Sequence, residues 1–154
     1  MSSTGAREEL MAWFDAYLDA LNAHDIPAVL EFMSDDVVYA DMAVGERMEG
    51  RVATGEFLGR MATDVSSDYR FDTEQVLIDG ESFALVWTMS GTKDRGDEQA
   101  GVPATGRRFQ VPGVSIGRLR DGKVVEQRDY WNMAGFLAQV GLMPVPQAAA
   151  PATG

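Results

Sequence analysis

The chain has 154 residues, 45 % of them apolar, which suffices for one domain with a packed core and argues against wholesale disorder. Its formal net charge is −11, with acidic residues scattered along the chain, so nucleic acid and anionic membranes are disfavoured as partners. Because there is no cysteine, the composition excludes disulfides, thiolate chemistry and thiolate metal sites.

The ends of the chain carry few signals. No basic segment followed by an apolar run opens the sequence, and no apolar run approaches the length of a membrane span. We therefore expect a soluble, cytoplasmic protein without a membrane partner. We predict a flexible polar tail at residues 1–5, the folded domain at 6–146, and a disordered Ala/Pro/Gly-rich tail at 147–154.

Helical patterns dominate the first half of the chain, where apolar residues recur at helical spacing along one face. The predicted elements are a helix with its apolar stripe at Leu10, Trp13, Phe14, Tyr17, Leu18 and Leu21, a short helix capped by Asp25, a strand at 37–41, a loop at 45–50 and a third helix at 52–61.

The second half is rich in strands separated by turn residues. We predict strands at 69–78 and 82–92, a polar Gly-rich excursion at 93–105, a strand at 107–119 with a bulge or edge defect at Pro112-Gly113, a tight turn at Asp121-Gly122, a strand up to Trp131, and a short helix stopped by Gly141. Helices followed by hairpins indicate a single α+β domain, in which helices cover the concave face of a curved antiparallel sheet and enclose a pocket.

The last strand carries the main candidate for chemistry. Its alternation places Gln127, Asp129 and Trp131 on one face. A carboxyl beside an indole on a face covered by helices is partly desolvated, which raises its pKa. Asp129 is therefore a candidate proton carrier.

Several other residues are candidates for the same pocket. Asp41 ends a strand, either as a second pocket carboxylate or as a turn-former, and Tyr39 shares its strand face. Tyr17 lies on the apolar stripe of the first helix, where it either packs in the core or contacts a ligand. The remaining candidates for the core or the pocket wall are Trp13, Phe14, Trp87 and Trp131. His24, the one histidine, lies in a turn between helices, so we expect neither a catalytic triad nor a zinc site.

The order of elements and three strings of residues, at 86–92, 101–108 and 121–126, resemble the SnoaL-like polyketide cyclases of the nuclear transport factor 2-like superfold. The resemblance covers about residues 9–144. In that family an aspartate soon after the start of the last strand is the acid/base of an intramolecular aldol ring closure, and Asp129 stands at that place. Gln127 stands where the family often has a histidine.

Two sister families also resemble parts of this chain. The strings at 128–132 and 39–42 are similar to limonene epoxide hydrolase, in which an aspartate, a tyrosine and an amide hold a water; Asp41 stands in place of the amide. The strings at 16–22 and 37–41 are similar to ketosteroid isomerase. That resemblance implies that Tyr17 binds an oxyanion and that Asp41 moves a proton.

These resemblances imply an enzyme without cofactor or metal that acts on a hydrophobic, carbonyl-bearing small molecule, by aldol ring closure or isomerisation. Asp129 would move the proton, with Asp41 as the second carboxylate, and Tyr39 or Tyr17 would stabilise the enolate oxygen. Gln127 would orient Asp129 or the substrate. The alternatives are an epoxide hydrolase and a non-catalytic small-molecule binding protein. We also expect a homodimer built on the outer face of the sheet, where Tyr130 points.

Overall fold

The computed structural model describes residues 3–144, with helices mainly in the first half and strands in the second. In chain order the elements are α1 (Ser3–Asn22), α2 (Ile26–Leu30), β1 (Met33–Asp41), β2 (Glu46–Glu49), α3 (Arg51–Arg60), the π-helical turn η1 (Met61–Val65), β3 (Arg70–Asp79), β4 (Ser82–Thr92), β5 (Arg108–Arg120), β6 (Lys123–Trp131) and α4 (Met133–Gln139). None of these helices is long and apolar enough to span a bilayer.

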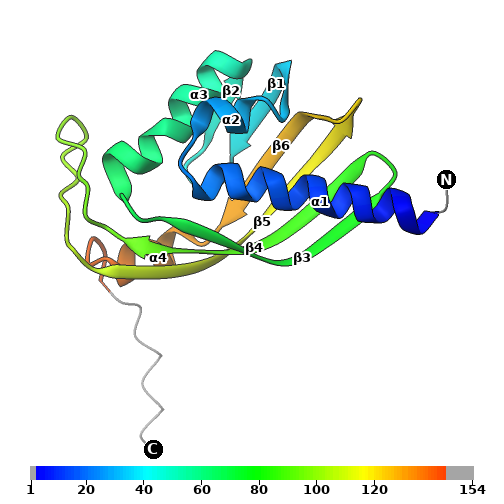
Figure 1. Ribbon diagram of the computed structural model, residues 1–154. Coiled ribbons are helices and arrows are strands. Elements are labelled where there is room, and N and C mark those ends of the chain that lie inside the picture. Colours follow the sequence, from blue (N-terminus) through cyan, green and yellow to red (C-terminus); the bar gives the residue numbers. More distant parts are fainter. Residues whose placement is uncertain (1–2, 145–154) are drawn as a thin grey trace, which may run out of the picture.

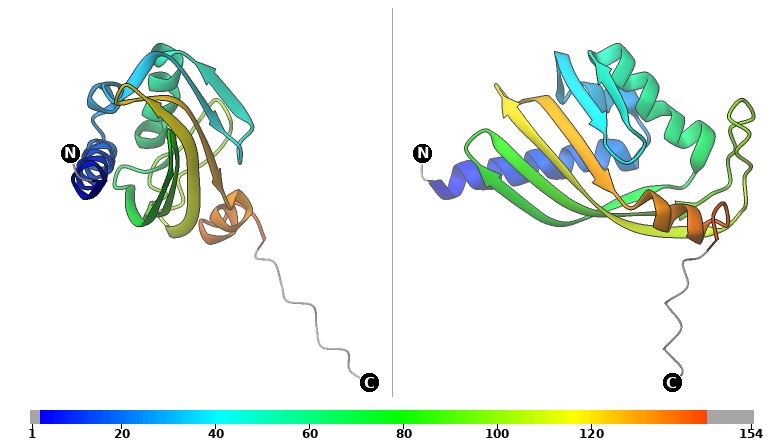
Figure 2. Two further views of the ribbon diagram at one scale, coloured as in Figure 1. Left: turned by 90° about the vertical axis from the view of Figure 1, so that its right-hand side faces the viewer. Right: turned by 180° about the vertical axis from the view of Figure 1, so that it is seen from behind.

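The six strands form one sheet in the order β2-β1-β6-β5-β4-β3. Helices α1, α2 and α3 lie over its concave face, and α4 packs against the start of β5 (Figures 1 and 2). The predicted α+β architecture with helices on the concave face of a curved sheet is thereby confirmed. Three register shifts, in the β1–β6, β3–β4 and β5–β6 pairs, accompany the curvature, as expected because bulges bend and twist a strand.

One strand pairing differs from the prediction of a fully antiparallel sheet. Strand β1 runs parallel to β6, and Asp41 is paired in register with Asp129. The turn residues of the sequence specify only the hairpins between chain neighbours. Since β1 and β6 are remote in the chain, no turn between them specifies their relative direction.

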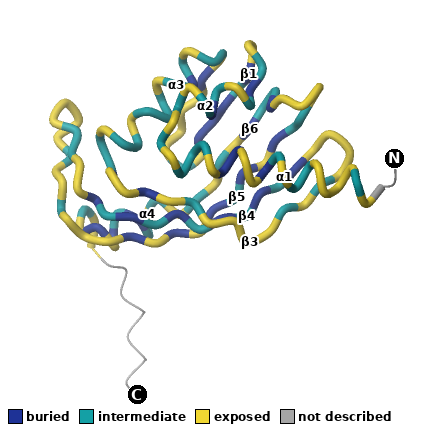
Figure 3. Tube along the Cα trace, viewed as in Figure 1, coloured by how far each residue is buried: buried dark blue, intermediate teal, exposed yellow. Residues whose placement is uncertain are grey.

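The core fills the space between α1 and the sheet. Phe14, Tyr17 and Leu18, at helical spacing on α1, are at most 5 % exposed. Phe83 and Leu85 on β4 are buried beneath them, with Ala84 facing outwards. Figure 3 shows this alternation of buried and exposed residues along the central strands. Because the period of two is maintained, one sheet face is available to line a cavity.

Several predicted boundaries are corrected by the structure. Helix α1 begins at Ser3, so part of the tail expected at residues 1–5 is helical, whereas the tail expected at 147–154 lies outside the described residues. The expected loop at 45–50 contains β2, which pairs with β1. The pairing of β4 with β5 runs through Pro112-Gly113 without a bulge.

Candidate active site

A cavity of about 400 Å³ lies between the concave face of the sheet and the helices. Its lining is mostly apolar, and one group of polar side chains lies on β1, β5 and β6. Further charged residues line it elsewhere, namely Glu46, Arg60, Asp64, Lys93 and Asp97. Seven of the nine predicted site residues line it, namely Tyr17, Tyr39, Asp41, Trp87, Gln127, Asp129 and Trp131. The parity of the last strand thus placed Gln127, Asp129 and Trp131 on the correct face.

Asp129 is the centre of the polar group. Its Oδ1 accepts hydrogen bonds from the Ser115 hydroxyl at 2.6 Å and from Nε2 of Gln127 at 3.0 Å. Its Oδ2 accepts a hydrogen bond from the Tyr39 hydroxyl. Each carboxylate oxygen can accept about two hydrogen bonds, so Oδ1 is saturated and Oδ2 keeps one lone pair.

The surroundings of Asp129 favour its protonated form. Burial raises the pKa of this carboxyl, and the neighbouring charge of Asp41 acts in the same direction. The hydrogen bonds from Ser115, Tyr39 and Gln127 oppose this shift because they stabilise the carboxylate, but the pKa remains above its usual value. Asp129 is therefore a stronger base than an exposed aspartate.

Two tyrosines supply neutral hydroxyls to the same group. Tyr17, from α1, donates to Oε1 of Gln127 at 2.8 Å, which leaves the amide nitrogen of Gln127 directed at Asp129. Burial and the Asp129 carboxylate raise the pKa of both Tyr17 and Tyr39 well above the usual range. Both hydroxyls therefore stay protonated near neutral pH and serve as donors.

Ser115 is the site residue that sequence reasoning missed. It lies on β5 opposite Asp129, and its hydroxyl also accepts a hydrogen bond from the indole nitrogen of Trp87 at 2.9 Å. The Trp87 ring lies directly over Gly113, where a Cβ would be only 2.1 Å from the ring. Gly113 therefore allows Trp87 to lie close enough to hold Ser115.

The reason for missing Ser115 is a register shift. Counting back across the turn from Arg120 opposite Lys123 would place Val114 opposite Asp129. The shift between Arg118 and Leu119 moves the pairing by one residue, so Ser115 takes this position and shares the inner face. Nothing in the residues of this hairpin distinguishes a bulged from an unbulged pairing.

Asp41 lies beside Asp129 but has a different set of contacts. Its two carboxylate oxygens accept from the indole nitrogen of Trp131 at 3.1 and 3.0 Å, and Oδ1 also accepts from the backbone N–H groups of Ala43 and Val44. Asp41 thus closes the turn after β1 and fixes the Trp131 ring on the cavity wall. Both alternatives of the sequence analysis hold geometrically, since Asp41 is a turn-former and also lines the cavity.

Trp13 and Phe14, candidates for the core or the pocket wall, are not among the residues that line the cavity, so their placement on the pocket wall is corrected. The Trp13 indole donates to the carbonyl of Gly122 at 3.1 Å, which joins α1 to the β5–β6 turn. Phe14 packs edge-on against Phe83 in the core, with ring centroids 5.1 Å apart. Helical spacing identified the buried face of α1, but it does not distinguish residues that contact the cavity from those packed beyond its end.

Several solved structures are similar to this chain. A candidate polyketide cyclase from Xanthomonas campestris pv. campestris is 29 % identical, with 87 % of this chain and 98 % of that chain covered and a TM-score of 0.71. One from Pseudomonas putida is also 29 % identical, with 82 % and 94 % covered and a TM-score of 0.67. A protein with a ketosteroid isomerase-like fold from Catenulispora acidiphila is 20 % identical, with 85 % of this chain and 93 % of that chain covered. The TM-score of 0.74 shows a shared fold.

A family profile described as a SnoaL-like domain matches residues 14–127. The match covers most of the chain, from the core face of α1 to the Gln127 that holds Asp129. The chain belongs to the SnoaL-like domain family.

Proposed function

We propose that this protein is a cofactor-independent acid/base enzyme that acts on a hydrophobic, carbonyl-bearing small molecule, in the manner of a polyketide cyclase or an isomerase. The observation that carries the proposal is Asp129 on the wall of an apolar cavity, bonded to three neutral donors, with one lone pair of Oδ2 left. The likeness to candidate polyketide cyclases supports the substrate class.

The proposed first step is removal of a proton from the carbon next to a substrate carbonyl. Oδ2 of Asp129 accepts the proton, the C–H bond breaks, and its electron pair passes into an enolate. The negative charge moves from the carboxylate to the enolate oxygen. Once Asp129 is protonated it no longer requires three donors, so the Tyr39 hydroxyl is free to donate to the enolate oxygen.

The second step returns the proton. In a ring closure the enolate carbon attacks a second carbonyl of the same molecule, and the new alkoxide takes the proton from Asp129. In an isomerisation Asp129 returns the proton to a different carbon. Ser115 and Gln127 keep the carboxyl in place through both steps by holding Oδ1.

The contacts favour this chemistry over epoxide opening. Opening an epoxide with water requires an acid for the leaving oxygen as well as a base for the water. Asp41, the second carboxyl, is engaged by Trp131 and by the turn after β1. Among the contacts of residues 3–144, the side chains bonded to Asp129 are a serine, an amide and a phenol, with no cationic group.

Proton exchange tests the proposal without knowledge of the natural substrate. The protein is incubated in D₂O with α-tetralone, an apolar aromatic ketone, and deuterium next to the carbonyl is followed by NMR. We expect exchange faster than in buffer for the wild type, and exchange at the buffer rate for Asp129→Asn. If the ketone quenches the fluorescence of Trp87 and Trp131 but exchanges at the buffer rate with both proteins, the protein is a binding module.

A further inference from the structure

Lys93 stands at the base of the excursion formed by residues 93–107, directly after β4. Its backbone N–H donates to the carbonyl of Arg107, and its carbonyl accepts from the N–H groups of Thr105 and Gly106, each at 2.9 Å. These bonds join the two legs of the excursion where it leaves the sheet. The excursion then projects from the sheet on the side where α3 ends (Figure 1).

The Lys93 side chain turns back into the protein instead of pointing to solvent. The residue is 2 % exposed and lines the cavity. Its Nζ donates to the carbonyl oxygens of Asp64 at 3.3 Å, of Pro103 at 3.2 Å and of Arg95. An ammonium has three N–H donors, so all of them are used and none is left for an anionic ligand.

The positive charge of Lys93 is balanced by nearby carboxylates that do not contact its Nζ. Within residues 3–144 no carboxylate forms an ion pair with it, and burial lowers the pKa of the ammonium. The negative charges of Asp64, Asp94 and Asp97 oppose this shift. The three carbonyls are therefore the direct partners that Lys93 would lose on substitution.

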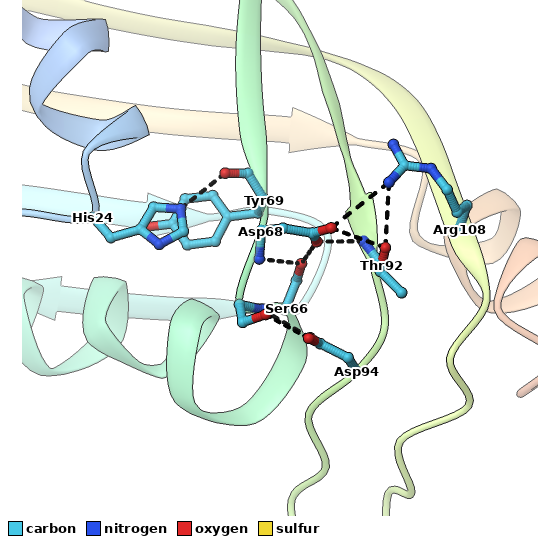
Figure 4. Close-up of polar contacts among 8 residues, drawn as sticks. His24, Ser66, Asp68, Tyr69, Thr92, Asp94 and Arg108 are labelled. Atoms are coloured by element: carbon cyan, nitrogen blue, oxygen red, sulfur yellow. Dashed lines mark hydrogen bonds and ion pairs between the residues drawn. The ribbon is translucent and has the colours of Figure 1, made fainter.

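These partners lie on two different walls. Asp64 belongs to η1, and carbonyls at a helix end lack partners within the helix. Close by, the N–H of Arg95 donates to the carbonyl of Val65 at 3.2 Å. The Asp94 carboxylate accepts from the N–H of Ser67 at 2.8 Å and from its hydroxyl. Figure 4 shows Asp94 beside the neighbouring Ser66. These bonds, and the bond from Lys93 Nζ to the carbonyl of Asp64, join the excursion to the segment 61–67, whereas the carbonyls of Arg95 and Pro103 belong to the excursion itself.

Both segments line the cavity, with Met61, Asp64 and Val65 on one side and Lys93, Asp97 and Val102 on the other. We propose that Lys93 is a positioning residue that clasps these two walls of the cavity together, and that its release opens a route by which small neutral molecules reach the Asp129 end. The inference depends on the cavity alone and not on the reaction at Asp129.

The first test measures access to the cavity. Trp13→Phe leaves Trp87 and Trp131, which both line the cavity, as the tryptophans of the chain. In that background we expect Lys93→Met to raise the acrylamide quenching constant about twofold or more, because local opening exposes the rings. Lys123→Met, at the other lysine, serves as the matched control and should leave quenching unchanged. Equal quenching in all three proteins would overturn the proposal.

Hydrogen exchange tests whether the two walls are coupled. We expect Lys93→Met to accelerate amide exchange about tenfold in both 61–67 and 93–107. The reason is that the net free energy contributed by one lost hydrogen bond corresponds to a change of about tenfold in the opening equilibrium. Faster exchange in 93–107 alone would contradict a clasp. If Lys93→Met does not fold, the native wild type is acetylated instead and the extent of modification of each lysine is measured. We expect Lys123 to be modified and Lys93 to be protected. Equal acetylation of the two lysines would refute the burial on which the proposal rests.

Discussion

Replacing Asp129 by asparagine exchanges one carboxylate oxygen for an amide nitrogen at the centre of the site. The asparagine oxygen can keep the hydrogen bonds from Ser115 and Gln127, which now reach Oδ1 at 2.6 and 3.0 Å. The amide nitrogen then faces the Tyr39 hydroxyl, which can rotate to accept instead of donate. The fold should therefore persist, while the lone pair of Oδ2 that is proposed to accept the substrate proton is lost.

The expected magnitudes follow from that geometry. Loss of a positioned general base slows a reaction about 10²- to 10⁴-fold, which corresponds to about 3–5 kcal/mol in the activation free energy. Stability should move the other way. Because burial raises the pKa of Asp129, its stabilising contribution is complete below the unfolded-state pKa and is lost as the pH rises through the folded-state pKa. At pH 7 Asp129→Asn should be at least as stable as the wild type, and this advantage should vanish in acid.

The assay combines α-tetralone deuterium exchange with urea unfolding at pH 7, both measured on the same preparations. Asp121→Asn, in the exposed turn before β6, is the matched control and should change neither quantity. Exchange by Asp129→Asn within a few-fold of the wild type would remove Asp129 from the mechanism. A large loss of stability at pH 7 would show that the carboxylate is structural.

Three further predictions concern the neighbours of Asp129 and the outer face. Tyr39→Phe removes the donor to Oδ2, so exchange should slow about 10²-fold and the pKa of Asp129, read from the pH–rate profile, should rise. Asp41→Asn keeps an oxygen for Trp131 and the turn, so most of the activity should remain; a loss equal to that of Asp129→Asn would make Asp41 part of the proton transfer. We expect a homodimer that forms through the outer sheet face, where Ile116 is 38 % exposed, and we expect Ile116→Glu to be a monomer. A monomer mass for the wild type in light scattering would contradict the dimer.

Local patterns were sufficient to predict the hairpins and the direction of the main side chains. Asp121 and Gly122 form the β5–β6 turn as predicted, whereas Gly80 and Glu81 form the β3–β4 turn, one residue later than the predicted Asp79-Gly80. Period-two alternation placed Asp129 on the covered face. Gly141 ends α4 with a positive φ of 80°, as its position after the last apolar residues predicted. These features depend on residues close together in the chain.

Features that depend on remote contacts were not predictable in the same way. The parallel pairing of β1 with β6 has no local signal, and neither does the register shift that brings Ser115 opposite Asp129. Trp13 and Phe14 lie on the correct face of α1 but beyond the cavity, because the position of the helix along the sheet is set by packing. The role of Lys93 depends on carbonyls of two segments whose proximity only the folded structure reveals.

The most direct measurement of the central claim is the pKa of Asp129 itself. The carboxyl carbons of the wild type are titrated by ¹³C NMR, and the Asp129 resonance is assigned as the one missing from Asp129→Asn. Burial in the cavity predicts a midpoint above the usual 3.8 of an aspartate. A midpoint at or below 3.8 would mean that the three donors outweigh burial, and Asp129 would then be a structural carboxylate and not the base.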